Sequence, residues 1–68
     1  MKIFMDRLKE QRKLYGLTQR DMAERLGISQ PSYIRYENGS AEPSLESLVK
    51  IADTFDVSVD YLLGRTDY

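Results

Sequence analysis

Residues that favour the start of a helix alternate along the chain with residues that favour its end. Serine or threonine, which cap helix N-termini, precedes four apolar segments, and a glycine able to adopt the left-handed conformation follows most of them. Within the segments the apolar residues recur at steps of three and four. The pattern predicts five short helices, with approximate limits Ile3 to Tyr15, Thr18 to Gly27, Ser29 to Gly39, Ser44 to Phe55 and Ser58 to Gly64.

The predicted fold is all-α and compact. Apart from the brief Val57-Ser58-Val59, no segment alternates apolar and polar residues over the length of a strand. The connections between helices are short, which favours a globule over an extended array. A chain of 68 residues is enough for one domain, and we place that domain over residues 1–68.

The composition argues against several classes of function. Cysteine and histidine are both absent, which excludes disulfides and thiolate or imidazole metal sites. The sequence contains no phosphate-cradling glycine loop and no convincing nucleophile–base pair, so we expect no enzyme, metal or cofactor. No apolar run approaches the roughly 20 residues that cross a bilayer, and the start, MKIFMDRLKE, lacks a signal-peptide core. We therefore expect a cytoplasmic protein without a membrane partner.

Charge is distributed unevenly, although the net charge is only -1. Residues 1–38 carry eight lysines and arginines against five acids, or +3, whereas residues 39–68 carry two against six, or -4. The basic excess of the first half suggests attraction to an anionic partner, although solvated helix faces often carry such charge as well.

Only three residues, Gly27-Ile28-Ser29, separate the second predicted helix from the third. A connection of this length containing glycine is typical of the helix-turn-helix motif. Such a turn makes the two helices cross steeply, so that one end of the third helix projects from the body.

Motifs along nearly the whole chain, from about Arg7 to Gly64, resemble the Cro/phage-repressor (XRE) family of helix-turn-helix DNA-binding proteins. The resemblance is carried by these runs in order: Gly16-Leu17-Thr18-Gln19, Ala23, Leu26-Gly27-Ile28-Ser29, Tyr36-Glu37-Asn38-Gly39, Pro43-Ser44-Leu45 and Val57 to Gly64. It implies a compact five-helix, lambda-repressor-like domain whose third helix enters the major groove. The expected function is sequence-specific binding of double-stranded DNA as a transcriptional regulator, more often a repressor, acting as a homodimer on a two-fold operator, with no small-molecule substrate.

The resemblance assigns base reading to the outer face of the third helix, at Gln30, Pro31 and Arg35. Chemistry supports the assignment, because glutamine can pair with adenine and arginine with guanine in the major groove. Pro31 and Ile34 offer only carbon, which suits a thymine methyl group. Ile34 could alternatively belong to the rim of the core.

Six further residues are expected near phosphates. Gln19 matches the family's phosphate-contacting glutamine at the start of the second helix, where the helix dipole favours an anion. It could instead simply start that helix, and Arg20 could pair with a neighbouring acid. Tyr36 could present its hydroxyl to a phosphate, although a core position is expected for both Tyr36 and Tyr33. The full set is Thr18, Gln19, Arg20, Tyr36, Asn38 and Ser40.

The resemblance also implies a buried ion pair between Arg12 and Glu37, tying the first helix to the third; the alternative is two exposed charges that never meet. The last helix carries more apolar residues than a five-helix monomer of this size needs, since Val59, Tyr61 and Leu63 are not expected all to face inward beside Leu62. These three are therefore expected at a dimer interface, with core filling as the alternative.

Some positions depart from the family pattern. Gln11 stands where an apolar residue is common, so the first helix is expected to pack less tightly. Asp56 replaces a common glycine but tolerates the left-handed conformation. Two other functions remain open: an antitoxin or restriction–modification controller protein, and a helical protein-interaction module that does not bind DNA. The acidic pI of about 5.3 favours the last of these.

Overall fold

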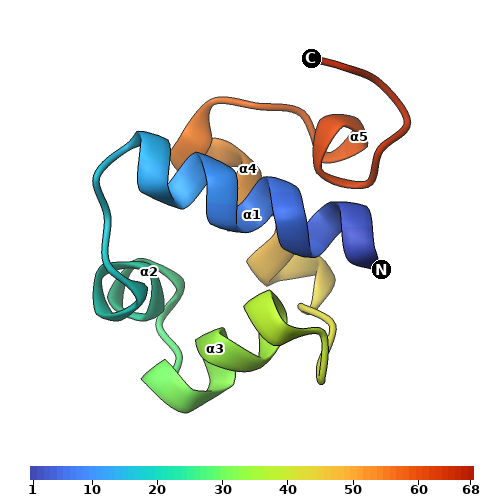
Figure 1. Cartoon of the computed structure of the whole chain (residues 1–68). Helices are drawn as coiled ribbons and strands as arrows, with labels where there is room; N and C mark the ends of the chain where they lie inside the picture. The colour runs from blue at the N-terminus through green and yellow to red at the C-terminus, as the bar shows by residue number, and fades with distance from the viewer.

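The computed structural model describes all residues from Met1 to Tyr68 and contains helices but no strand (Figure 1). Each of the five predicted helices is present, so the all-α prediction is confirmed. Their limits are α1 Lys2–Leu14, α2 Gln19–Leu26, α3 Gln30–Asn38, α4 Leu45–Phe55 and α5 Val59–Leu62. None of these helices is long and apolar enough to span a membrane.

Side-chain caps begin four of the helices, as the serine and threonine pattern predicts. The reciprocal cap at α2 is complete: the backbone N–H of Asp21 donates to Thr18 Oγ1 over 3.0 Å, and the backbone N–H of Thr18 donates to Asp21 Oδ2 over 2.9 Å. Asp21 therefore closes the capping box although glutamate or glutamine is the usual residue there. Ser29, Ser44 and Ser58 cap α3, α4 and α5 in the same way through their hydroxyl groups.

Left-handed residues end α2, α3 and α4. Gly39 ends α3 with φ 82°, a conformation that favours glycine, and a Cβ placed on it would lie 2.7 Å from Met5 Sδ, at the flexible end of that side chain. Asp56 ends α4 with φ 52° and is the only non-glycine residue with positive φ. The prediction that Asp56 keeps the left-handed geometry is confirmed.

The core lies among all five helices; in the view of Figure 1, α2 and α3 lie below α1, α5 lies above it and α4 passes behind it. Its largest fully buried side chains are Tyr33, Phe55, Leu8, Met22, Ile51 and Leu62. Tyr33 is therefore a core residue, as predicted. Tyr36 is partly buried and packs against the same cluster, with its ring centroid 6.2 Å from that of Tyr33.

The premise that led us to place a dimer interface on the last helix was wrong. Val59, Tyr61 and Leu63 are all partly buried and pack against the core of the same chain. They can do so because α5 is a single turn that lies against α1. The guanidinium group of Arg7, on α1, lies 4.2 Å from the centroid of the Tyr61 ring. Core filling, the alternative, describes these three side chains in the monomer.

Polar side chains of α1 complete this contact with α5 and the chain after it. Arg7 donates to the carbonyl oxygens of Tyr61 and Thr66. Gln11 donates through Nε2 to the Tyr61 hydroxyl over 3.3 Å, so the glutamine expected to loosen α1 instead finds a partner on α5.

Candidate nucleic-acid interface

The turn between α2 and α3 orients α3. Gly27 ends α2 with φ 69°, the backbone N–H of Ile28 donates to the Ala23 carbonyl over 3.0 Å, and Ser29 then caps α3. The side chain of Ile28 packs against the core and so anchors the turn itself. As a result α3 lies along one edge of the molecule, crossing below α1 in the view of Figure 1.

The two sides of α3 differ sharply in burial. Tyr33 and Glu37, one turn apart, are buried against the body. Gln30, Pro31 and Arg35 are exposed on the outer side, and Ile34 is partly buried without packing on the core cluster. Three of the four residues predicted to read bases are therefore exposed, and the fourth, Ile34, is partly buried. Pro31 is tolerated because the N–H groups of a first turn have no partner within the helix.

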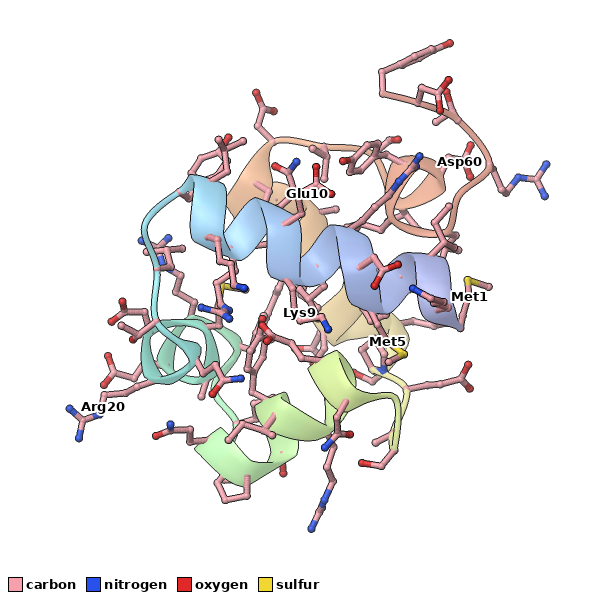
Figure 2. All side chains as sticks on the ribbon, in the orientation of Figure 1. Met1, Met5, Lys9, Glu10, Arg20 and Asp60 are labelled. Carbon is pink, nitrogen blue, oxygen red and sulfur yellow. The ribbon has the colours of Figure 1, made fainter.

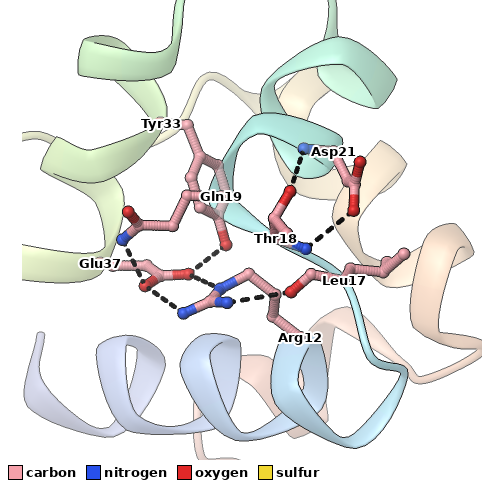
Figure 3. A network of polar contacts seen from close by, with 7 residues as sticks. All are labelled: Arg12, Leu17, Thr18, Gln19, Asp21, Tyr33 and Glu37. Atoms are coloured by element: carbon pink, nitrogen blue, oxygen red, sulfur yellow. Dashed lines mark hydrogen bonds and ion pairs between the residues drawn. The ribbon is translucent and has the colours of Figure 1, made fainter.

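The inner side of α3 is fixed by a polar network around the buried carboxylate of Glu37 (Figure 3). Arg12 Nε lies 2.6 Å from Glu37 Oε2 and Arg12 Nη2 lies 3.2 Å from Oε1, while Nη1 donates to the Leu17 carbonyl over 3.0 Å. The Tyr33 hydroxyl donates to Oε2, and Gln19 Nε2 donates to Oε1 over 3.2 Å. Arg12 and Glu37 thus form the ion pair that the resemblance implies, with additional partners.

The network joins α1, α2 and α3 through the Glu37 carboxylate, which accepts hydrogen bonds from one side chain of each helix. Burial acts to raise the pKa of Glu37, but the hydrogen bonds from Arg12, Tyr33 and Gln19 together outweigh burial, and the pKa is lowered. The hydrogen bond with Glu37 raises the pKa of Arg12. Burial and then the bond to Glu37 raise the pKa of Tyr33, which keeps its hydroxyl a donor. Since no buried side-chain polar atom lacks a partner, the network is fully satisfied.

Two members of the network were not predicted as such. Gln19 was assigned to phosphate, but its amide nitrogen contacts Glu37; Tyr33 was assigned to the core without a role for its hydroxyl. The spacing of four between Tyr33 and Glu37 is a signal that could have revealed their contact. Nothing in the local sequence brings Gln19 to Glu37, because that contact depends on how α2 crosses α3.

Four of the other residues expected near phosphate lie at the start of α2 and at the C-terminal end of α3. Thr18 holds the cap of α2, and Arg20 extends from α2 away from the body (Figure 2). At the C-terminal end of α3, Asn38 Oδ1 accepts from the backbone N–H and from the hydroxyl of Ser40, over 3.0 and 2.6 Å. This bonding orders the start of the loop between α3 and α4.

Acid should weaken the domain through the Glu37 network. Because the pKa of Glu37 lies below its unfolded value of about 4.3, its contribution to the free energy of unfolding is complete above that pH and is lost as pH falls through the lowered pKa. The stability difference between wild type and Glu37→Gln, measured by thermal unfolding, should therefore shrink between about pH 7 and about pH 3. Asp6 and Asp21, whose pKa values are also lowered, are present in both proteins and cancel. A difference that stays constant over this range would contradict the role given to Glu37.

Comparison with known proteins identifies the arrangement. A family model described as helix-turn-helix matches residues 8–62. The chain is 51% identical over 60 residues to the transcriptional repressor RstR of cryptic phage CTXphi from Vibrio cholerae, covering 88% of this chain and 54% of RstR. It is 42% identical over 55 residues to the HTH-type transcriptional regulator MJ0272 of Methanocaldococcus jannaschii, covering 81% of this chain and 83% of that protein.

A solved structure has the same fold. The N-terminal DNA-binding domain of SinR from Bacillus subtilis superposes with a TM-score of 0.82 and 30% identity, covering 93% of both chains. The chain spans about half the length of the first curated relatives that it matches, 53% of the regulator YqaE of Bacillus subtilis and 54% of RstR. The matched residues include the whole segment from α2 to α5, and the chain therefore belongs to the helix-turn-helix family, of the Cro/phage-repressor (XRE) type.

Proposed function

We propose that this protein binds double-stranded DNA in a sequence-specific manner, with α3 in the major groove, and regulates transcription in the cytoplasm as a homodimer. The observation that carries the proposal is the division of α3 into two faces. Tyr33 and Glu37 hold its inner face to α1 and α2, whereas Gln30 and Arg35 are free on its outer face. A helix held this rigidly can present side chains to base edges without first becoming ordered.

The outer face carries the chemistry of base recognition. Gln30 lies in the first turn and can pair with adenine, and Arg35 can make a bidentate contact with guanine further along the groove. Pro31 and Ile34 lie between them and offer apolar contact to thymine methyl groups. Each good bidentate pair discriminates against a wrong base by roughly 1–3 kcal/mol.

Contacts with the DNA phosphate backbone would orient α3. We place phosphates at the N-terminus of α2, near Thr18, Gln19 and Arg20, and along the loop that Asn38 and Ser40 begin. Tyr36, partly buried on α3, would contact a phosphate through its hydroxyl. Such contacts fix register and carry no sequence information themselves.

Replacing Gln19 with alanine should weaken binding to all duplexes alike. The change removes one contact near phosphate and one donor to Glu37, but it alters no group on the base-reading face. Affinities for a panel of duplexes that differ at single base pairs should fall by a common factor. A change in the order of affinities among those duplexes would contradict the assignment of Gln19 to the DNA phosphate backbone.

Repression is the favoured sign of regulation. RstR is described as a repressor and is 51% identical, whereas the activator BcrR of Enterococcus faecalis is 37% identical and the match covers only 30% of its length. A restriction–modification controller or an antitoxin would use the same DNA-binding face, so those roles differ from repression only in what is regulated. None of these roles requires catalysis.

Selection of bound sequences from a random duplex pool tests the proposal most broadly. We expect enrichment of a site with two-fold symmetry, and affinity that falls steeply as salt rises, because cations are released from neutralised phosphates. The protein-interaction alternative, favoured only by the acidic pI, predicts neither result. Absence of both enrichment and salt-dependent binding to random duplex would reject DNA binding.

A further inference from the structure

Met5, on α1, packs against the start of the loop that joins α3 to α4. A Cβ built on Gly39 would lie 2.7 Å from Met5 Sδ and 3.1 Å from Met5 Cε, so the end of the methionine fills the space beside this glycine. Ala41 and Pro43, further along the loop, line the same groove as Met5. In the view of Figure 2, Met5 lies above this loop. The position of the loop therefore depends on an apolar contact with α1.

The groove makes the Met5 side chain accessible to small reagents. It has a volume of about 190 Å³ and lies between the N-terminal part of α1, the loop and Leu48 of α4. A water molecule takes up about 30 Å³ in the liquid. The groove therefore has room for hydrogen peroxide, which has only two heavy atoms. Since Met5 lines the groove and is only partly buried, such a molecule reaches it from solvent.

Methionine supplies all the sulfur of this chain, because cysteine is absent. The three methionines differ in access: Met1 is 62% exposed, Met5 is partly buried, and Met22 is fully buried in the core. Oxidation follows exposure, so Met1 and Met5 are open to a peroxide whereas Met22 is protected. Of the two accessible thioethers, that of Met5 is the one packed against Gly39.

We propose that Met5 is a site of reversible oxidation, at which a peroxide converts the thioether to a sulfoxide and thereby weakens DNA binding. The proposal rests on the proposed function, because it concerns the phosphate contacts placed on the loop. The sulfur attacks one oxygen of hydrogen peroxide, and the S–O bond forms as the O–O bond breaks. The proton of the transferred hydroxyl ends on the departing hydroxide, which gives water. Sulfur loses two electrons to the peroxide, and methionine sulfoxide reductases reverse the change.

A sulfoxide changes the contact with Gly39 from apolar to polar. The S–O group forms hydrogen bonds with water, and burying it against Gly39 beside apolar side chains costs free energy. The oxidised side chain is therefore expected to turn toward solvent and leave Gly39 without its packing partner. Gly39 lies between Asn38 and Ser40, which are bonded to each other and which we assign to phosphate. Movement of Gly39 therefore displaces both phosphate contacts together.

Affinity for DNA before and after peroxide treatment tests the proposal. Wild type, untreated or treated with hydrogen peroxide, is titrated into a duplex carrying the selected site, and mass spectrometry of its peptides locates the added oxygen. We expect oxygen on Met1 and Met5 but not on Met22. Affinity should fall by about tenfold, which corresponds to the loss of one hydrogen bond to a charged group. Treatment with methionine sulfoxide reductases and a dithiol should restore it.

Two substitutions at Met5 form a matched pair. Met5→Leu keeps an apolar side chain but has no sulfur, so its affinity should be the same before and after peroxide, although Met1 is still oxidised. Met5→Gln places a polar group of similar length at the same position, so its affinity should be lowered without peroxide. Thermal unfolding checks that each protein remains folded at the temperature of the titration.

Wild type that is oxidised at Met5 and binds with unchanged affinity would overturn the proposal. An equal loss of affinity in oxidised Met5→Leu would do the same, as would a Met5 that stays reduced while Met1 is oxidised. Amide chemical shifts of Gly39, Ser40 and Ala41 in the free protein report on the loop without DNA, and they should change on oxidation. If untreated wild type binds no duplex, the proposed function fails, and these shifts still decide whether Met5 holds the loop.

Discussion

Replacing Arg12 with alanine should lower the free energy of unfolding by about 3–5 kcal/mol, because the substitution leaves the carboxylate of Glu37 buried without its countercharge. Small domains have total stabilities of only about 5–15 kcal/mol, so the variant should lose much of its stability. Denaturant unfolding followed by circular dichroism measures the loss. Arg12→Lys keeps the charge but loses the bidentate contact, so its free energy of unfolding should lie between that of wild type and that of Arg12→Ala.

Two controls separate the ion pair from general effects of losing an arginine. Arg25→Ala removes an exposed arginine from α2 and should change stability by less than about 0.5 kcal/mol. Adding Glu37→Gln to Arg12→Ala removes the stranded charge and should recover part of the loss. A cost for Arg12→Ala below about 1 kcal/mol, comparable to an exposed pair, would show that Glu37 is not held as described.

Replacing Arg35 with alanine should relax sequence preference at one base pair of the selected site, by roughly 1–3 kcal/mol of discrimination. The side chain is exposed in the free protein, so folding should be unaffected. Selection from the random pool, repeated with the variant, measures the effect position by position. Gln19→Ala serves as the contrasting variant, since it should lower affinity without changing preference. If selection with Arg35→Ala gave the wild-type preference at every base-pair position, the result would show that Arg35 does not read a base.

The helices could be predicted from the sequence because their signals are local. Thr18 and Asp21 form a cap within one turn, and Asp56 ends α4 through its own backbone conformation. The exposure of Arg35 was also predictable, since helical periodicity places it on the side of the helix away from Tyr33. The family resemblance was needed to pair Arg12 with Glu37, which lie 25 residues apart in the sequence.

Sequence reasoning missed contacts that depend on how the helices pack. The contact between Gln19 and Glu37 requires the observed crossing of α2 and α3, which no local pattern specifies. The expectation that Tyr61 does not face inward treated α5 as a free helix. In the structure α1 partly covers this side chain, because Arg7 lies over its ring and Gln11 donates to its hydroxyl.

These packing contacts also explain how a small domain can hold rigidly the helix that we propose to read bases. Glu37 accepts hydrogen bonds from α1, α2 and its own helix, so α3 cannot tilt without breaking several of them. The outer face therefore keeps one orientation relative to the N-terminus of α2. Base and phosphate contacts can then form together in a single docking geometry.

The most direct measurement is a titration of the ¹⁵N-labelled protein with a duplex carrying the selected site, followed by amide and side-chain chemical shifts. If α3 enters the major groove, the largest changes should fall on Gln30, Ile34 and Arg35, with smaller ones at Gln19 and Ser40. Duplex that shifts resonances only in α4 and α5, or that leaves Gln30 and Arg35 unchanged at saturation, would show that DNA does not meet this face of the protein.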